Sequence, residues 1–218
     1  MRRSIGLLAA GLLFARVMVA QQDVASRLTG HVPAAVVSAV QALADSAAAR
    51  GLPVSPLVNK ALEGAIKGMP PERIVMAARS VFSQLGVAAG AVRGAGVTAP
   101  DAIEAGAFAL AAGLDSGGVA AVARSADRTH PAATALQVVG TLVALGVPRG
   151  QGVGLVQATI RSGGPVSDLA NLPSRVQAAM AGGVPPTAAA AGLERAASAH
   201  LTPKPQGQGK GQGNPHRP

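Results

Sequence analysis

The sequence contains no cysteine, tryptophan or tyrosine, and phenylalanine occurs three times in 218 residues. Without cysteine the chain can form no disulfide, no thiolate-based zinc site and no cysteine nucleophile. With so few aromatic rings, its core has to be built from the aliphatic residues within its 49% hydrophobic content. Alanine is the strongest helix former, and the alternating Thr/Tyr/Phe-rich stretches that mark sheets are absent. The composition therefore predicts an all-α fold with no β-sheet.

The formal charge of +9 is concentrated toward the two ends of the chain. Three arginines fall within the first 16 residues, and Lys204, Lys210 and Arg217 lie near the other end. Between residues 26 and 202 there are 13 basic and 9 acidic residues, a net charge of +4. A dedicated nucleic-acid binder carries a clustered basic stripe. We therefore predict no specific nucleic-acid partner.

The first 20 residues have the layout of a secretory signal peptide. A short positive segment precedes an apolar run over 5–15, and Ala20 ends the leader before polar residues. The run is too short for a helix across a bilayer, which needs roughly 20 apolar residues. We expect residues 1–20 to be a signal peptide, the protein to be periplasmic or secreted, and the mature chain to lack a transmembrane span. An uncleaved membrane anchor and a buried core helix are the alternatives.

Short turns of glycine, an aliphatic residue, and then proline or a helix-capping residue recur along the chain. The paired turns lie 17 positions apart: Gly51 and Gly68, Gly96 and Gly113, and Thr129 and Gly146, the last pair opening on the degenerate Thr129-His130-Pro131. Glycine ends a helix, and proline or aspartate begins the next. The turns therefore predict helical hairpins over a single all-α domain of residues 21–202.

The apolar periodicity between these turns is that of helices. Stretches expected to be helical include 33–50, 53–67, 70–85, 173–182 and 185–200, with two further hairpins between them. Residues 86–95 contain several glycines and are predicted to form a connection or a weak short helix. Thr98 to Asp101 resembles a capping box, with Asp in place of Glu or Gln.

The second arm of the hairpin also repeats. Aligning residue 51 with residue 96 aligns residues 74–80 with 119–125, and Arg79 with Arg124. This predicts an array of helical hairpins resembling an α-solenoid. A non-repeating, irregular helical bundle is the alternative.

The last segment, 203–218, has four prolines, four glycines, three basic residues and no acidic residue. It offers no apolar side chain except proline, so it is predicted to be a disordered basic tail. If the tail and the repeated arginines act together, they could contact an anionic surface. The candidate residues for that contact are Arg79, Arg124, Lys204, Lys210 and Arg217.

No motif in the sequence carries catalysis or a cofactor. The four histidines, His31, His130, His200 and His216, are not spaced as metal ligands, and His31 and His130 are expected on turn surfaces. The string Asp115 to Gly118 resembles the nucleophile motif of chymotrypsin-like proteases over four residues, but it coincides with a repeat turn and is predicted to cap a helix. The glycine-rich segment 150–154 does not follow a strand, so helix packing or a fraying helix start is favoured over phosphate binding.

We therefore expect an exported, non-enzymatic helical scaffold whose partner is a protein or a component of the cell envelope. The alternative is a binder of anionic polymers or membrane surfaces that uses the basic tail and the face of Arg79 and Arg124. An enzyme is the least favoured class, and no cofactor or metal is predicted.

Overall fold

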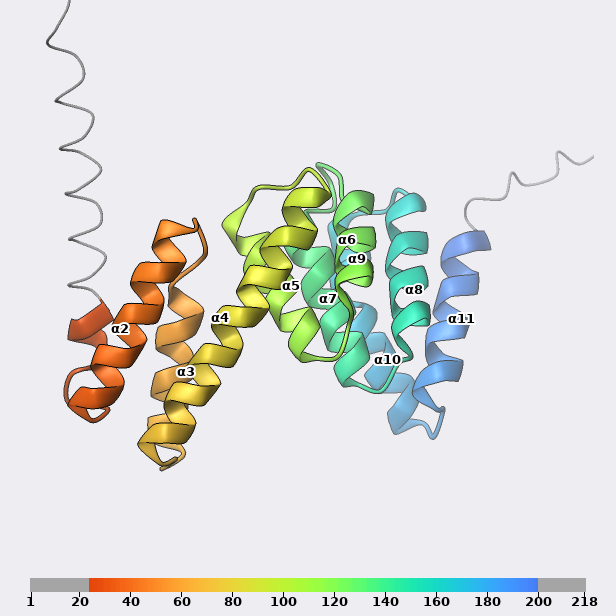
Figure 1. Cartoon of the computed structure of the whole chain (residues 1–218). Helices are drawn as coiled ribbons and strands as arrows, with labels where there is room; N and C mark the ends of the chain where they lie inside the picture. Colours follow the sequence, from red (N-terminus) through yellow and green to blue (C-terminus); the bar gives the residue numbers. More distant parts are fainter. Residues whose placement is uncertain (1–23, 200–218) are drawn as a thin grey trace, which may run out of the picture.

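The computed structural model describes residues 24–199, and every regular element in this range is a helix. Residues 24–28 form a short helical turn, followed by an isolated bridge between Thr29 and Val32. The predicted all-α fold is confirmed for this part of the chain (Figure 1). The predicted leader, 1–20, and the predicted tail, 203–218, lie outside the described residues.

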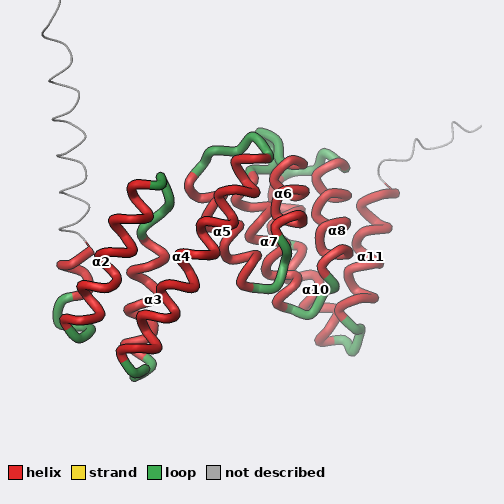
Figure 2. The backbone as a smooth tube through the Cα atoms, in the orientation of Figure 1, coloured by secondary structure: helices red, strands yellow, loops and turns green. Residues whose placement is uncertain are grey.

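The helices run up and down in succession, with the turns alternating between the two long edges of the array (Figure 2). Their bounds are α2 Ala34–Ala49, α3 Ser55–Ile66, α4 Pro71–Gly94, α5 Pro100–Ala111, α6 Ser116–Ser125, α7 Ala132–Ala144, α8 Arg149–Arg161, α9 Val166–Ala170, α10 Leu172–Ala181 and α11 Pro186–Ala199.

The helices pack in two layers. In one layer α2 packs against α4, α4 against α6, α6 against α8, and α8 against α11. In the other layer α5 packs against α7, and α7 against both α9 and α10. The long helix α4 runs obliquely between the α2–α3 end and the α5–α6 end (Figure 1). The chain is therefore an array of helical hairpins, extended along one direction.

Glycine turns separate most of these helices. Every residue with a positive φ between 24 and 199 is a glycine: Gly30, Gly51, Gly68, Gly96, Gly113, Gly146, Gly163 and Gly183. At the first hairpin turn the N–H of Leu52 donates to the carbonyl of Ala47 at 2.8 Å, and that of Gly51 donates to Ala48 at 3.0 Å. This is the Schellman pattern, in which glycine takes the left-handed conformation that a side chain disfavours.

The degenerate turn before α7 is built differently, because it has no glycine. The Asp127 Oδ1 atom accepts from the backbone N–H groups of Thr129 and His130, at 2.8 and 2.7 Å. The His130 side chain folds back, so that its Nδ1 lies 3.1 Å from the same oxygen. His130 is only 1% exposed, so its predicted place on the turn surface is wrong. A side-chain carboxylate here organises the turn that glycine makes elsewhere.

The connection predicted over 86–95 is also wrong, because α4 continues unbroken to Gly94. Gly86 and Gly90 lie in the helix interior, and Leu85, Ala88 and Val92 are buried beside them. That burial outweighs the intrinsic cost of helical glycine, about 1 kcal/mol each. Among the described residues, α4 is the one helix whose length and apolar composition would suit a membrane span, and buried core helices can pass the same test.

The offset of 45 residues between hairpins appears in the helix starts. Ser55 and Pro100 begin helices of equal length, and Pro71 and Ser116 begin the second arms. The predicted cap at Asp115 is confirmed, since its Oδ1 accepts from the N–H of Gly118 at 2.7 Å. The predicted capping box at Thr98 is wrong.

The helix after Thr98 starts at Pro100 without a side-chain cap, and the carboxylate of Asp101 accepts from the N–H of its neighbour Ala102 at 2.8 Å. The sequence also did not predict α9, a five-residue helix that lies between the turn at Gly163 and α10.

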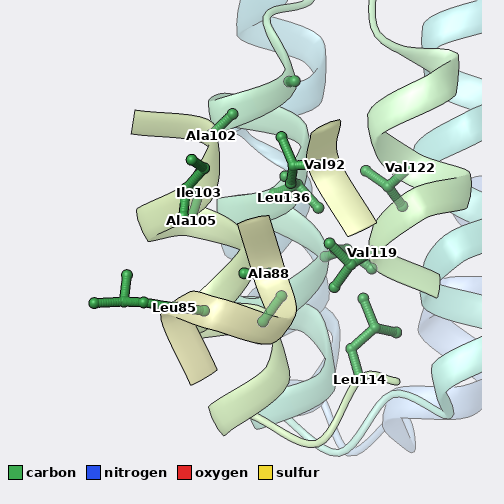
Figure 3. Close-up of a cluster of buried hydrophobic side chains, with 14 of the residues drawn as sticks. Leu85, Ala88, Val92, Ala102, Ile103, Ala105, Leu114, Val119, Val122 and Leu136 are labelled. Carbon is green, nitrogen blue, oxygen red and sulfur yellow. The ribbon is translucent and has the colours of Figure 1, made fainter. Parts of the chain in front are cut away.

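The core is aliphatic and continuous along the array. Side chains from four consecutive helices gather between the layers (Figure 3), among them Val92 of α4, Ile103 of α5, Val119 of α6 and Leu136 of α7. Each is no more than 1% exposed. Alanines at many of the remaining core positions allow the helices to approach closely.

Candidate functional site

Helices α3, α5, α7, α9 and α10 line a hollow of about 700 Å³. Helix α3 lines one side of it through Pro56 and Asn59, and Pro173 at the start of α10 lines the other. The floor comes from α5 and α7. Its residues on these two helices are Asp101, Glu104, Ala105, Phe108, Ala133, Thr134, Gln137, Val138 and Thr141. Both helices supply small apolar residues at the bottom and polar ones at the rim.

A second hollow of about 450 Å³ adjoins the first. It lies between α3, α4 and α5, and the two hollows share Pro56, Asn59, Glu104 and Phe108. We call the pair together the groove. Phe108 stands where the two hollows meet and is 38% exposed, one of the few large apolar side chains left open to solvent. An aromatic ring at the middle of a groove is a common anchor for a bound chain.

Phe108 has a fixed place because α7 offers it a glycine. A Cβ atom at Gly140 would lie 2.8 Å from two ring atoms of Phe108 and 3.0 Å from the Cα of Ala109. The absence of that atom lets α5 and α7 pack closely and lets the ring lie across α7. The shape of the groove therefore depends on one missing methyl group.

The first hollow is acidic. Asp101 and Glu104 both line it, and neither forms a salt bridge within residues 24–199. Partial burial, and then the charge of Asp101, raise the pKa of Glu104 above its ordinary value. The two carboxylates, one helical turn apart, repel each other, and a cation between them would relieve that repulsion.

Glu63, one of the two acids that line the second hollow, is already paired with lysines. Lys60 and Lys67 contact the Glu63 carboxylate at 2.6 and 2.5 Å. Their hydrogen bonds lower the pKa of Glu63 to about 2. Among the acids that line the groove, Asp101 and Glu104 are thus the two without a salt bridge in residues 24–199, and Glu104 borders both hollows.

No described interaction brings together the basic residues that were predicted to contact an anionic surface. Arg79 is exposed on α4 and lines a separate hollow of about 330 Å³ beside α2. Arg124 is exposed in the last turn of α6. Lys204, Lys210 and Arg217 lie outside the described residues. The joint contact of these basic residues with an anionic surface stays a prediction.

The glycine-rich segment lies within α8, and a Cβ at Gly154 would lie 2.7 Å from an oxygen of Glu194 on α11. That oxygen belongs to the movable end of a side chain, so the contact does not test the predicted choice between helix packing and a fraying helix start. Within residues 24–199, no three His, Asp or Glu side chains cluster in a way that could hold a metal ion.

Sequence reasoning missed the groove and its central residue, although a signal was present. Asp101, Glu104 and Phe108 are spaced i, i+3 and i+7, which places them on one face of α5, opposite the buried Ile103. Asp101 was instead assigned to the predicted capping box at Thr98.

Comparison with known proteins adds no relative: no protein-family model, no curated protein and no solved structure matches the chain.

Proposed function

We propose that this chain is a non-enzymatic interaction protein that holds a cationic segment of polypeptide in the groove. The observation that carries the proposal is the chemistry of the groove floor: an exposed aromatic ring beside two unpaired carboxylates. Phe108 offers apolar contact area, and Asp101 and Glu104 would pair with Lys or Arg. Gln137 and Asn59, both exposed at the rim, offer hydrogen bonds to a backbone, Asn59 through its side-chain NH2 group because its Oδ1 already accepts from Arg27 at 3.1 Å.

The extended array supports this proposal over a compact catalytic pocket. Helical arrays present long surfaces made from successive repeats, and function on such surfaces comes from the side chains of one face. Here five helices from different parts of the chain contribute to one hollow. A bound segment would cross them in turn.

A peptide-display selection on the immobilised full chain tests this proposal. Selected peptides are expected to be enriched in Lys and Arg. Their affinity should fall at least about tenfold, or about 1.4 kcal/mol, for Phe108→Ser and for Glu104→Lys. Met76→Ser is the matched control, since Met76 is 60% exposed and lines the separate hollow beside α2. A library that yields no binders, or binders indifferent to Phe108 and Glu104, would overturn the proposal.

We also propose that the protein works outside the cytoplasm, on the strength of the signal-peptide layout of residues 1–20. Expression of the full chain in a bacterial host, followed by fractionation and intact-mass measurement, tests this. The expected species lacks about the first 20 residues and is found in the periplasm or medium. A full-length chain retained in the cytoplasm contradicts it.

A further inference from the structure

In the first hollow of the groove the two carboxylates have no paired cation, although Lys60 lines the adjoining second hollow, and the chain carries cations beyond its last described helix. Within residues 24–199 no basic side chain pairs with Asp101 or Glu104. Residues 203–218 contain Lys204, Lys210 and Arg217 and no acid. The segment is thus complementary in charge to the first hollow.

The topology places the end of α11, from which that segment continues, at the edge of the array where α5, α7 and α10 begin. Helices α10 and α11 form a hairpin through the turn at Gly183, so Ala199 lies at the same edge as the start of α10. The up-and-down order places the starts of α5 and α7 at that edge too (Figure 1). Asp101, Thr134 and Pro173 each lie near one of these starts. The hollow therefore opens at the edge of the molecule from which the chain continues.

Residues 203–218 are long enough to reach from the end of α11 to α5. From α11 the path to α5 crosses α10 and α7, three interhelical steps of about 8–10 Å, or roughly 30 Å. Sixteen residues, 203–218, span up to about 50 Å when extended. The segment can reach Glu104 with length to spare. Its prolines and glycines at 203–215 suit an extended path across helices.

We propose that residues 203–218 occupy the groove of their own chain and compete there with the external partner. The inference rests on the proposed function, because it assigns an intramolecular occupant to the same peptide-binding groove. Lys210 would sit between Asp101 and Glu104, with the proline-containing stretch near Phe108; Lys204 follows Ala199 too closely to span roughly 30 Å. A tethered occupant needs little intrinsic affinity, since the linker holds it at millimolar effective concentration.

Disulfide trapping gives a direct test, because the natural chain has no cysteine to interfere. In the full chain, Thr134→Cys on α7 is paired with Gln208→Cys, and the yield of intramolecular disulfide is measured under mild oxidation. Arg161→Cys paired with Gln208→Cys is the control. Arg161 ends α8, which packs directly on α11, so it is a neighbour that an unbound segment would meet at least as often.

Occupancy of the groove predicts at least a threefold higher yield for the Thr134 pair than for the Arg161 pair, roughly the ratio expected for modest tethered binding. Adding Glu104→Gln should reduce that excess. Equal yields, or an excess unchanged by Glu104→Gln, would overturn the inference. A disulfide-linked dimer in place of the monomer would show that the segment binds a second copy, which also overturns it.

A competition experiment separates the failure of this inference from the failure of the proposed function. In the full chain, Lys204→Glu, Lys210→Glu and Arg217→Glu together should raise the affinity of display-selected peptides by about threefold to tenfold, as expected when a tethered competitor is removed. Unchanged affinity for peptides that still depend on Phe108 would reject the intramolecular occupant and leave the groove as a binding site. Loss of all peptide binding that depends on Phe108 would reject both.

Discussion

At the scale of single residues, Gly140 sets the position of the ring at the centre of the groove. Gly140→Ala would place a methyl group against Phe108 and against the backbone of Ala109. We expect a loss of about 1–3 kcal/mol in the free energy of unfolding, measured by chemical denaturation. Phe108→Ala in the same chain should relieve only part of this loss, because the contact with Ala109 remains. Full relief would show that α5 and α7 are not as closely packed as described.

Glu63 provides a prediction with a defined pH window. Its pKa is lowered from 4.5 to about 2 by the hydrogen bonds from Lys60 and Lys67. A carboxyl whose pKa is lower in the folded than in the unfolded state contributes its full stability at pH values above the unfolded-state pKa. That contribution is lost as the pH falls from about 4.5 to about 2. Glu63 and its two lysine partners are exposed, so Glu63→Gln should lower the free energy of unfolding by no more than about 1 kcal/mol at pH 7.

Thermal melts of wild type and Glu63→Gln across this range check the window. The difference in Tm should shrink as the pH falls from 4.5 toward 2. A difference that stays constant with pH would mean that the substitution acts through packing or helix propensity.

At the scale of the helix and its turns, Gly68 and Gly90 form a matched pair. A Cβ atom would meet nothing within 4 Å at either position. Gly68 has a φ of +63°, in the left-handed region, whereas Gly90 lies inside α4. Gly68→Ala should cost about 1–2 kcal/mol, and Gly90→Ala should gain about 0.5–1 kcal/mol. Equal effects in denaturant titrations would contradict a conformational role for the turn glycines.

The same elements explain how far sequence reasoning reached. Helix starts and stops were predictable because glycine and proline act through their own backbone, within a few residues. The extent of α4 was not, since its glycines are tolerated through burial of Leu85 and Val92 against other helices. His130 was misplaced for a related reason. The buried His130 ring interacts with the Asp127 carboxylate, which organises this turn in place of a glycine. The spacing of the residues in the sequence does not predict that interaction.

At the scale of the whole molecule, the groove could not be read from the sequence because it assembles residues from Pro56 to Pro173. Each lining residue has an ordinary local explanation as a cap, a surface amide or a helix start. The order of packing alone makes them neighbours. The groove can therefore be recognised only when the packing of the helices in two layers is known.

The array should also unfold unevenly. Helix α2 packs against α3 and α4, whereas α7 packs against five other helices. Leu136→Ala in α7 should cost about 2–5 kcal/mol and increase hydrogen exchange throughout residues 24–199. Val36→Ala in α2, an equally buried position, should increase exchange mainly in α2 and α3. Exchange measured by mass spectrometry checks this, and a uniform response to both substitutions would contradict it.

The glycine turns have a consequence for how such a molecule can vary. Each one is specified within a few consecutive residues and makes its hydrogen bonds to the helix it ends. Where a helix stops is thus encoded separately from which partner it faces. A whole hairpin could be duplicated or removed without redesigning the remaining boundaries. The length of the array is therefore a quantity that evolution or an engineer could adjust independently of the side chains on its faces.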